Sequence, residues 1–357
     1  METADSMTDS SQSPQKSEID VLVVGAGPIG LETAYELRQA GLSTLNIDRA
    51  ALGNQIMEFP PGVRFFSSPE RIAIAGVPLQ TVDQEKASRE EYLAYLRTVV
   101  LVHELPIRTF EEVRSINGSI GGFTTHTRTS SGIERTIHSR HIVLAIGGTA
   151  RHRTLGIPGE DLPHVLREVG DVHRFFKRRV LVVGGRNSAA DSALRIWRAK
   201  GEVTMTYRGE ELYPRIKYWI RPELEVLIRN EFIHCHYATR PVEILPDRVT
   251  LEHIHDGRRF DVPVDDVLLQ IGYEADMSLF KKLGCETDGD AQRVNHDPDT
   301  METSIPGIHV AGTSIAGTQA RFEVYIENAH VHARRIAAHL TGKPAPPTPR
   351  LPELPEA

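Results

Sequence analysis

Two glycine-rich turns are the parts of this sequence best suited to chemistry. The first lies in VLVVGAGPIGLETA at 21–34, where Gly25, Gly27 and Gly30 have the spacing G-x-G-x-x-G between a β-branched run and a helical segment. In such a turn the first glycine permits the tight bend, the second lets the backbone approach a pyrophosphate, and the third lets helix and strand pack closely. The N-terminus of the following helix offers unpaired N–H groups to phosphates. The pattern therefore predicts a dinucleotide site.

An acidic residue closes the strand that follows the first turn. Asp48 lies about twenty residues downstream of the turn, where a carboxylate accepts hydrogen bonds from the ribose hydroxyls of a dinucleotide. An acid at a strand end is also common as a loop cap, so Asp48 supports the motif without carrying it alone.

The second turn lies in VLVVGGRNSAADSA at 180–193 and fits G-x-G-x-x-A, except that Arg186 replaces the middle glycine. A side chain there limits how closely the backbone can approach a phosphate, although a guanidinium can itself contact one. The next strand ends in Tyr207-Arg208 rather than in an acid. Arginine can pair with the 2′-phosphate of NADPH, whereas a carboxylate would repel it. The pattern favours NADPH over NADH; the alternative is that Arg208 caps a surface loop.

Alternating strands and helices must hold both turns in place. Each turn is preceded by a β-branched run and followed by a helix, a glycine and a second strand, and each unit is followed by β-rich segments that predict a small antiparallel addition. This order predicts an α/β fold with two Rossmann-like dinucleotide-binding domains. The predicted pieces are strands at 20–24, 43–48, 180–183 and 202–207, a helix at 31–39, and β-rich additions at 123–142 and 249–269.

Composition excludes several other classes of protein. The net charge of −7 gives no basic excess of the kind that binds nucleic acid, and no apolar run is long enough to cross a membrane. The chain has two cysteines, Cys235 and Cys285, too far apart for a Cys-x-x-Cys pair and too few to suggest an oxidising compartment. We therefore expect a cytoplasmic protein. Residues 1–17, rich in Ser and Thr, and the proline-rich residues 343–357 are expected to be disordered tails.

The chain resembles the two-dinucleotide-binding flavoprotein reductases, and within them the thioredoxin-reductase-like branch that contains the bacillithiol-disulfide reductases. The resemblance extends over nearly all of residues 20–340. The stretches that carry it are GAGPIG (25–30), RFFSSPERIAIAG (64–76), IVLAIGG (142–148), VVGGRNSAADSAL (182–194), TYRGEELYPRIKYWIRPE (206–223), LLQIGYEAD (268–276), PGIHVAG (306–312) and YIENAHVHARRIAAHL (325–340).

This resemblance implies a three-layer ββα architecture in which an NAD(P)H-binding domain, 175–263, is inserted into an FAD-binding domain formed by 18–155 and 264–342. It also implies a homodimer. The residues that it assigns to FAD are Gly25, Gly27, Gly30, Asp48, Asn54, Ala145, Gly147, Gly312, Thr313 and Arg321. The residues assigned to NADPH are those of the second turn, Gly184, Gly185, Arg186, Asn187 and Ser188, and also Arg208 and Lys217.

The departures from the family pattern concern sulfur. Thioredoxin reductases carry a Cys-x-x-Cys pair that this chain lacks, and bacillithiol-disulfide reductase-like members carry a cysteine where Ile29 stands. Isoleucine cannot form a thiolate or a mixed disulfide. A further difference is that Gly312-Thr313 replaces the Gly-Asp pair of many flavoproteins. Neither Cys235 nor Cys285 is expected to face the flavin. The catalytic group would then be the flavin itself.

The sequence contains three His-x-His pairs, a spacing that could supply metal ligands. Residues two apart share one face of a strand, so the pairs at 234–236 and 253–255 could each present two imidazoles, whereas the pair at 330–332 lies in a predicted helix and would diverge. Spacing identifies no third ligand, and we expect no metal site.

The resulting hypothesis is an FAD-dependent NADPH oxidoreductase. Hydride would pass from NADPH to flavin N5 and then, without a cysteine relay, to an unidentified acceptor: a disulfide, a quinone, an iron–sulfur protein or oxygen. A flavin monooxygenase-like enzyme is one alternative, although GDVHRFF at 170–176 only loosely matches the fingerprint of that class. A regulatory FAD- or nucleotide-binding protein with little turnover is the other, kept open by Ile29 and Arg186.

Overall fold

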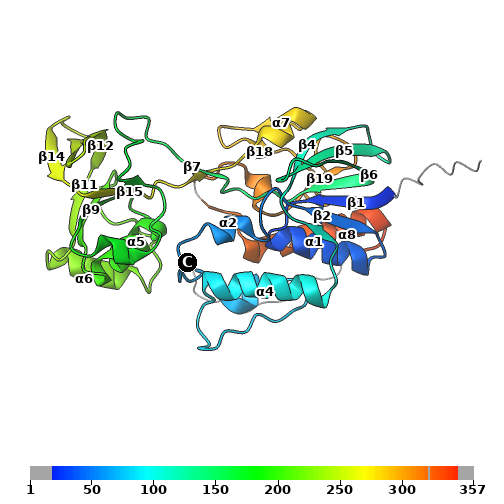
Figure 1. Ribbon diagram of the computed structural model, residues 1–357, viewed down its shortest axis with the longest axis horizontal. Coiled ribbons are helices and arrows are strands. Elements are labelled where there is room, and N and C mark those ends of the chain that lie inside the picture. The colour runs from blue at the N-terminus through cyan, green and yellow to red at the C-terminus, as the bar shows by residue number, and fades with distance from the viewer. Residues whose placement is uncertain (1–17, 321, 345–357) are drawn as a thin grey trace, which may run out of the picture.

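The computed structural model describes residues 18–320 and 322–344. Figure 1 shows two bodies side by side along the long axis, the larger one containing α1, α4 and α8 and the smaller one α5 and α6. Of the tails predicted at 1–17 and 343–357, residues 1–17 and 345–357 lie outside the described residues, as does Arg321, which was predicted to bind FAD.

The larger body is built on a sheet with the strand order β3-β2-β1-β6-β5-β4. The first half of β6 pairs antiparallel with β5, and its second half pairs parallel with β1 and with β19. Strand β6 thus passes from an antiparallel layer into a parallel one. The bounds are β1 Glu18–Val24, β2 Thr44–Ile47, β3 Ile107–Arg108, β4 Glu111–Asn117, β5 Phe123–Thr129, β6 Glu134–Leu144 and β19 Ile308–Val310.

The two faces of β1 are buried against different layers. Val21 and Val23 pack with residues of α1 and α8, whereas Leu22 and Val24 pack with Phe123 of the antiparallel layer. Successive side chains of a strand point to opposite faces, so a run of apolar residues fits a strand buried on both. The remaining elements are α1 Pro28–Gln39, α2 Asn54–Met57, α3 Pro69–Ile72, α4 Arg89–Val102, α7 Ser278–Leu283, α8 Ile326–Thr341, the 3₁₀ turn Gly312–Ala316, β17 Thr287–Asp288 and β18 Arg293–Val294.

The smaller body repeats this arrangement. Its parallel sheet has the order β11-β10-β9-β15-β8, with α5 and α6 on one face and the antiparallel sheet β12-β13-β14 on the other. The predicted three-layer ββα fold class is therefore confirmed. The bounds are β8 Val165–Leu166, the 3₁₀ turn Val172–Phe175, β9 Arg179–Val183, α5 Asn187–Arg198, β10 Glu202–Tyr207, α6 Arg221–Arg229, β11 His234–Tyr237, β12 Thr239–Ile244, β13 Arg248–His253, β14 Arg259–Pro263 and β15 Asp266–Leu269.

The chain crosses between the bodies through a short antiparallel ribbon. Strands β7 (Arg151–His152) and β16 (Tyr273–Glu274) pair with each other, and β7 lies between the two bodies in Figure 1. Strand β15 falls within 264–342, which the sequence analysis assigned to the FAD-binding part, yet it pairs with β9 in the smaller body. Because β15 is part of the parallel sheet of the smaller body, we propose that the second FAD-binding segment begins after β15, at the ribbon, and not at residue 264.

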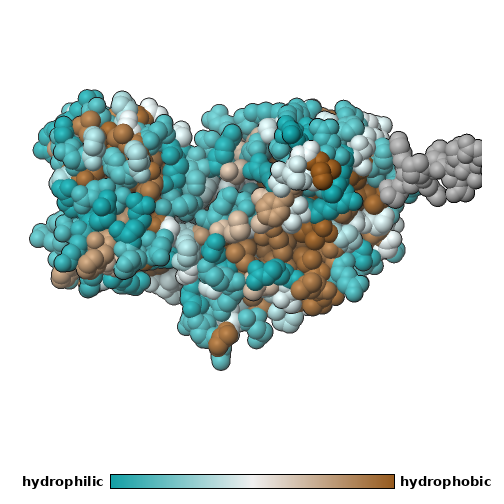
Figure 2. Space-filling view, in the orientation of Figure 1, coloured by the Kyte–Doolittle hydropathy of each residue, from teal (hydrophilic) through white to brown (hydrophobic). Residues whose placement is uncertain are grey.

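The surface of the two bodies differs in polarity. In Figure 2 the visible face of the smaller body is largely hydrophilic, whereas hydrophobic residues gather on the larger body near α1, α2 and α4. Leu101 and Val102, at the end of α4, are among the exposed hydrophobic residues. None of the described helices is long and apolar enough to span a membrane.

A buried carboxylate gives a test of how the smaller body is held together. Asp266, at the start of β15, is 0% exposed and accepts hydrogen bonds from Arg174 (2.9 Å) and Arg178 (2.5 Å). Replacing both arginines by methionine leaves a buried charge without its partners, which should cost about 3–5 kcal/mol in the free energy of unfolding. Urea unfolding followed by circular dichroism measures the loss.

The matched control is Arg248→Met, since Arg248 forms ion pairs with Asp247 and Asp261 at the surface. Exposed pairs of this kind contribute about 1 kcal/mol or less. Equal losses in the double variant and the control would show that Asp266 does not depend on its arginines.

Candidate functional site

A cleft of about 1560 Å³ lies between the two bodies. Both glycine turns open into it, and so do nearly all residues predicted to bind cofactors. The predicted residues that line it are Gly25, Gly27, Asp48, Asn54, Ala145, Gly147, Gly312 and Thr313 from the larger body, and Gly184, Gly185, Arg186, Asn187, Ser188, Arg208 and Lys217 from the smaller body. Gly30 does not line the cleft, and its surroundings explain why.

The glycines of the first turn have three different environments. A Cβ atom on Gly25, whose φ is +110°, would lie 2.3 Å from the carbonyl oxygen of Ala145, and one on Gly30 would lie 2.1 Å from the carbonyl oxygen of Gly25. Both positions therefore require glycine for packing. A Cβ on Gly27 would meet no atom within 4 Å, so the backbone there faces open space in which a ligand can approach it.

The N-terminus of α1 faces this open space without a capping side chain. Gly27 is the N-cap, Pro28 is the first helical residue, and the first turn contains no acidic residue. Helix N-termini carry unpaired N–H groups and a partial positive charge. This end of α1 therefore fits a pyrophosphate, as the turn predicted.

Asp48 follows β2 and is fixed beside the first turn. Its Oδ2 accepts a hydrogen bond from the backbone N–H of Ala26 (2.8 Å), and its Oδ1 accepts one from that of Ala50 (2.9 Å). Burial raises the pKa of Asp48, against the effect of these hydrogen bonds. Each carboxylate oxygen has a second lone pair, so the group can still accept hydrogen bonds from ligand hydroxyls in the cleft.

Two residues that the sequence analysis missed hold the segment after β6. The Gln55 side chain donates to the carbonyl oxygen of Ile146 (2.9 Å) and accepts from the Thr149 hydroxyl (2.9 Å). The Ser314 hydroxyl accepts from the backbone N–H of Gly147 (2.8 Å). These partners are 91 and 167 residues apart in sequence, so no local motif pointed to them. The predicted neighbour Asn54 instead donates its amide to Glu58, at 2.7 Å.

Ile29 occupies the wall of the cleft where the two ends of the larger body's sequence meet. It is 6% exposed, and a Cβ on Gly312 would lie 3.2 Å from the Cβ of Ile29. The N-terminus of α8 reaches the same cleft through Ile326 and Glu327. Within the described residues, the Glu327 Oε2 atom is buried without a hydrogen-bond partner, as expected where a polar ligand is to bind.

The second turn is partly covered by protein side chains. A Cβ on Gly184 would lie 2.4 Å from the carbonyl oxygen of Gln270, whereas one on Gly185 would lie 2.3 Å from the ring of Tyr207. Arg186 is the N-cap of α5, and its guanidinium donates to the carbonyl oxygen of Ala320 in the larger body (2.6 Å). The side chain that replaces the middle glycine therefore joins the two bodies.

Two further residues complete this side of the cleft. The Asn187 side chain accepts a hydrogen bond from the backbone N–H of Lys217 (2.9 Å). Arg208 is exposed after β10 and, within the described residues, has no ion-pair partner, because nearby Glu210 pairs with His255 (2.5 Å). Arg208 is thus available to an anionic ligand.

Neither cysteine lies at the cleft. Cys285 follows α7 and packs in the core of the larger body, where burial raises the pKa of its thiol. Cys235 lies on β11 in the smaller body, and burial raises its pKa to about 11. Both thiols are therefore protonated at neutral pH and poor nucleophiles.

Of the three His-x-His pairs, His234 and His236 share strand β11 as expected, whereas the residues of the other two pairs do not share a strand. His255 lies beyond the end of β13, so the expectation that it shares a strand with His253 is wrong. On α8, His330 pairs with the carboxylate of Glu32 (2.6 Å), whereas His332 accepts a hydrogen bond from the backbone N–H of Gly312 (3.1 Å). The last pair therefore diverges as predicted, and His332 positions the glycine that lines the cleft.

The open space at Gly27 allows a test of ligand binding that spares the fold. We expect Gly27→Val to fold, since Gly27 has φ −82° and ψ 179°, yet to lose FAD because the new side chain fills the space left for the phosphates. Titration of the apoprotein with FAD should give a Kd at least about tenfold higher than that of the wild type, equivalent to about 1.4 kcal/mol of binding free energy, and FAD per chain after gel filtration should fall as well.

Gly122→Val is the matched control, because a Cβ on Gly122 also meets no atom within 4 Å but lies outside the cleft. Circular dichroism checks that both variants are folded. Normal FAD content in Gly27→Val would mean that the phosphates do not approach this turn.

Comparisons with known proteins agree with this geometry. Residues 22–312 match the family model described as pyridine nucleotide-disulphide oxidoreductase. Bacilliredoxin reductase Bdr from Bacillus subtilis is 33% identical over 319 residues, covering 89% of this chain and 96% of the relative. Ferredoxin–NADP reductase 1 from Oceanobacillus iheyensis is 27% identical over 310 residues, covering 82% of this chain and 81% of the relative.

A solved structure is similar over the same range. Bacillithiol disulfide reductase Bdr from Bacillus cereus superposes with a TM-score of 0.86 at 33% identity and covers 91% of this chain and 99% of its own. The resemblance predicted from the motifs is thereby confirmed over both bodies and not only at the turns. This chain belongs to the pyridine nucleotide-disulphide oxidoreductase family.

Proposed function

We propose that this protein is an FAD-dependent NADPH oxidoreductase whose electron acceptor reaches the flavin without a protein cysteine. Membership of the family already establishes the general activity, that of an NAD(P)H-dependent flavoprotein oxidoreductase. The observation that carries the proposal is that both glycine turns open into one cleft. Two dinucleotides bound at these turns would share that space.

Residues of the larger body would bind FAD, and residues of the smaller body would bind NADPH. For FAD we propose the turn at 25–30, Asp48, Asn54, the segment 145–147 and Gly312-Thr313, with Gln55 and Ser314 as supporting residues. For NADPH we propose the turn at 184–188 with Arg208 and Lys217. The ribbon formed by β7 and β16 would separate the FAD-binding and NADPH-binding domains.

The chain's own groups contribute binding and charge, while the cofactors would supply the redox chemistry, with NADPH as hydride donor and FAD as acceptor. The N-terminus of α1 favours phosphate charge beside Gly27, and Asp48 accepts hydrogen bonds from hydroxyls. The N-terminus of α8 also reaches the cleft at Ile326, but the acidic Glu327 in its first turn offsets the partial positive charge of this helix end.

The positions of sulfur support direct reduction of the acceptor. Ile29 lines the cleft, whereas Cys235 and Cys285 do not. The names of the relatives suggest the first acceptors to test, a bacillithiol-type disulfide or bacilliredoxin and a ferredoxin. Quinones and oxygen complete the set, because both can react with reduced flavin directly.

One observation favours a regulatory alternative. Arg186 bridges from the second turn to Ala320 of the larger body, and the ring of Tyr207 covers Gly185. A protein held in this state would bind FAD and turn over little with any acceptor. The monooxygenase-like alternative has no such support, although it also predicts oxygen consumption that depends on NADPH. We further propose that the protein is cytoplasmic, as its composition suggested, and that it forms a homodimer, as the family resemblance implied.

The proposal predicts that the Cys235→Ala/Cys285→Ala double variant retains its activity. Under anaerobic conditions, NADPH should bleach the flavin absorbance of the wild type and the variant at rates within about twofold, since both thiols lie outside the cleft. The best acceptor found by adding each candidate in turn should then restore the colour equally in both.

Ile29→Cys is the companion variant, and it should add thiol-dependent disulfide reduction at the position where sulfur is missing. Loss of turnover in the double cysteine variant would contradict direct reduction. Failure of NADPH to bleach the wild type would contradict the enzyme proposal itself and favour the regulatory alternative.

Nucleotide preference depends on Arg208 in this proposal. Arg208→Ala should raise the KM for NADPH by about 10–150-fold and leave that for NADH nearly unchanged, because a charge-assisted hydrogen bond to phosphate contributes about 1.5–3 kcal/mol. Steady-state kinetics with both nucleotides measure this. Arg229→Ala, exposed on α6 and outside the cleft, is the control. Equal losses with both nucleotides would contradict a role for Arg208 at the 2′-phosphate.

A further inference from the structure

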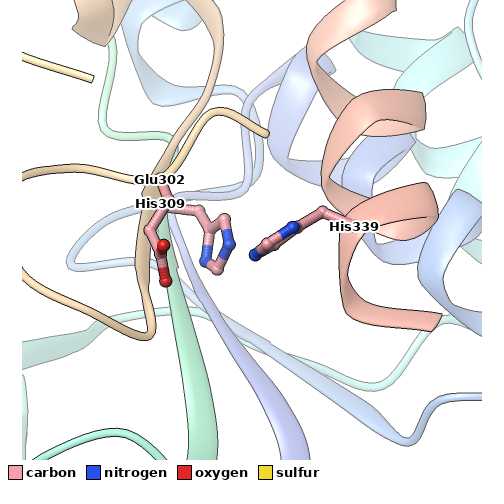
Figure 3. A group of neighbouring side chains, drawn as sticks. All are labelled: Glu302, His309 and His339. Atoms are coloured by element: carbon pink, nitrogen blue, oxygen red, sulfur yellow. The ribbon is translucent and has the colours of Figure 1, made fainter. Parts of the chain in front are cut away.

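A cluster of metal-ligating side chains lies in the larger body away from the cleft. Glu302, His309 and His339 each offer one ligand atom, and these atoms lie within 4.8 Å of one another. Figure 3 shows the carboxylate of Glu302 beside the ring of His309, with His339 extending toward them from α8. The three residues are not part of the His-x-His pairs that the sequence suggested.

The fold explains why they meet. His309 is the middle residue of β19, and Glu302 forms an isolated antiparallel bridge with it, so their side chains share one face. His339 lies in the last turn of α8, and Ile336 and Ala337 of this helix pack in the core against the same layer. A strand, its bridge partner and a helix end therefore converge.

His309 is the residue whose surroundings call for a ligand. Its side chain is 0% exposed, and within the described residues neither ring nitrogen has a hydrogen-bond partner. Buried polar atoms in folded proteins are nearly always paired, because leaving one unpaired costs free energy. His141 on β6 is a second such case, with a buried, unpartnered Nδ1 and a ring centroid 6.1 Å from that of His309. Burial, together with the nearby His339 and His141, lowers the pKa of His309 to about 3. The ring is therefore neutral, and neutral imidazole is the form that binds metals.

The other two side chains are poised for the same ion. One carboxylate oxygen of Glu302, Oε1, accepts the backbone N–H of Gly307 (2.7 Å), which orients the group and leaves Oε2 for a cation. His339 is exposed, with its ring centroid 5.5 Å from that of His309, so a cation has a path from solvent. It also lies at the C-terminal end of α8, where the helix dipole favours positive charge.

We propose that Glu302, His309 and His339 bind one divalent transition-metal cation of the zinc type. Two imidazole nitrogens and one carboxylate oxygen suit Zn²⁺ and its neighbours, whereas Mg²⁺ and Ca²⁺ prefer oxygen alone. Ligands about 2.1 Å from a tetrahedral ion lie about 3.4 Å apart. Closing the cluster from 4.8 Å therefore needs a shift of roughly 1.4 Å, which rotation of the exposed His339 side chain can supply.

The ion would join the end of α8 to β19, which leads directly into Gly312 at the cleft. Three protein ligands leave a fourth position to water. The site is a clip between two elements of the larger body and takes no part in the proposed electron transfer, so the two proposals stand or fall separately.

The test uses full-length, FAD-loaded protein without an affinity tag, because a polyhistidine tag would itself bind zinc. After removal of metals with a chelator, titration calorimetry with Zn²⁺ should show one ion per chain with a Kd on the order of micromolar or tighter. His339→Gln and Glu302→Gln should each weaken binding by about 100-fold or more. His126→Gln, which changes an exposed histidine on β5, should bind as the wild type does.

A second readout separates the site from unspecific zinc binding. At 100 times the Kd, Zn²⁺ should raise the thermal midpoint of the wild type by about 4 °C, and the same concentration should leave His339→Gln unchanged. Wild-type affinity retained in both His339→Gln and Glu302→Gln would overturn the proposal. So would the absence of any stoichiometric binding to the wild type, or binding of Mg²⁺ as tight as that of Zn²⁺.

Discussion

Both bodies depend on the same close contact between a glycine turn and the end of the neighbouring strand. In the larger body Gly25 leaves room for the carbonyl oxygen of Ala145, the residue after β6, and in the smaller body Gly184 leaves room for that of Gln270, the residue after β15. Backbone hydrogen bonds repeat as well, from Ala145 N–H to Val24 and from Gln270 N–H to Val183. A side chain at either glycine would separate the two strands that bring their carboxyl ends to the cleft. The cofactor-binding edge of each sheet therefore rests on the absence of a Cβ atom.

The two edges face one another because the chain crosses only through paired segments. Hydrogen bonds between β7 and β16 hold the outgoing and returning chains together, and Arg153 adds a side-chain bond to the carbonyl oxygen of Tyr273 (3.1 Å). Other polar contacts between the bodies join Arg186 with Ala320, Arg195 with Pro61, and Lys86 with the ring of Trp219. Small contacts of this kind allow domains to move relative to each other. The cleft thus depends on both the ribbon and the two turns.

Several polar side chains of the larger body support the backbone that lines the cleft, whereas the buried His309 has no comparable role. His332 accepts from the backbone of Gly312 and Ser314 accepts from that of Gly147, so the polar side chains near the proposed flavin site act on the backbone. His309, on the strand that leads to Gly312, has no such partner among the described residues. Because burial of an unpaired imidazole is unfavourable, the simplest account is that its partner is an ion that the chain gathers from solvent.

The sequence by itself determined the two turns, the order of strands and helices around them, and the cofactor class. These depend on local rules: a turn with φ +110° at Gly25 requires glycine, and a run such as VLVV fits a strand buried on both faces. Tertiary structure alone decided the contacts between distant residues. Pairing of β15 with β9, support of Gly147 by Ser314, and the meeting of Glu302 and His309 with His339 are not encoded in any spacing. Residues far apart in sequence meet only when packing of whole layers brings them together, and that packing is a property of the complete fold.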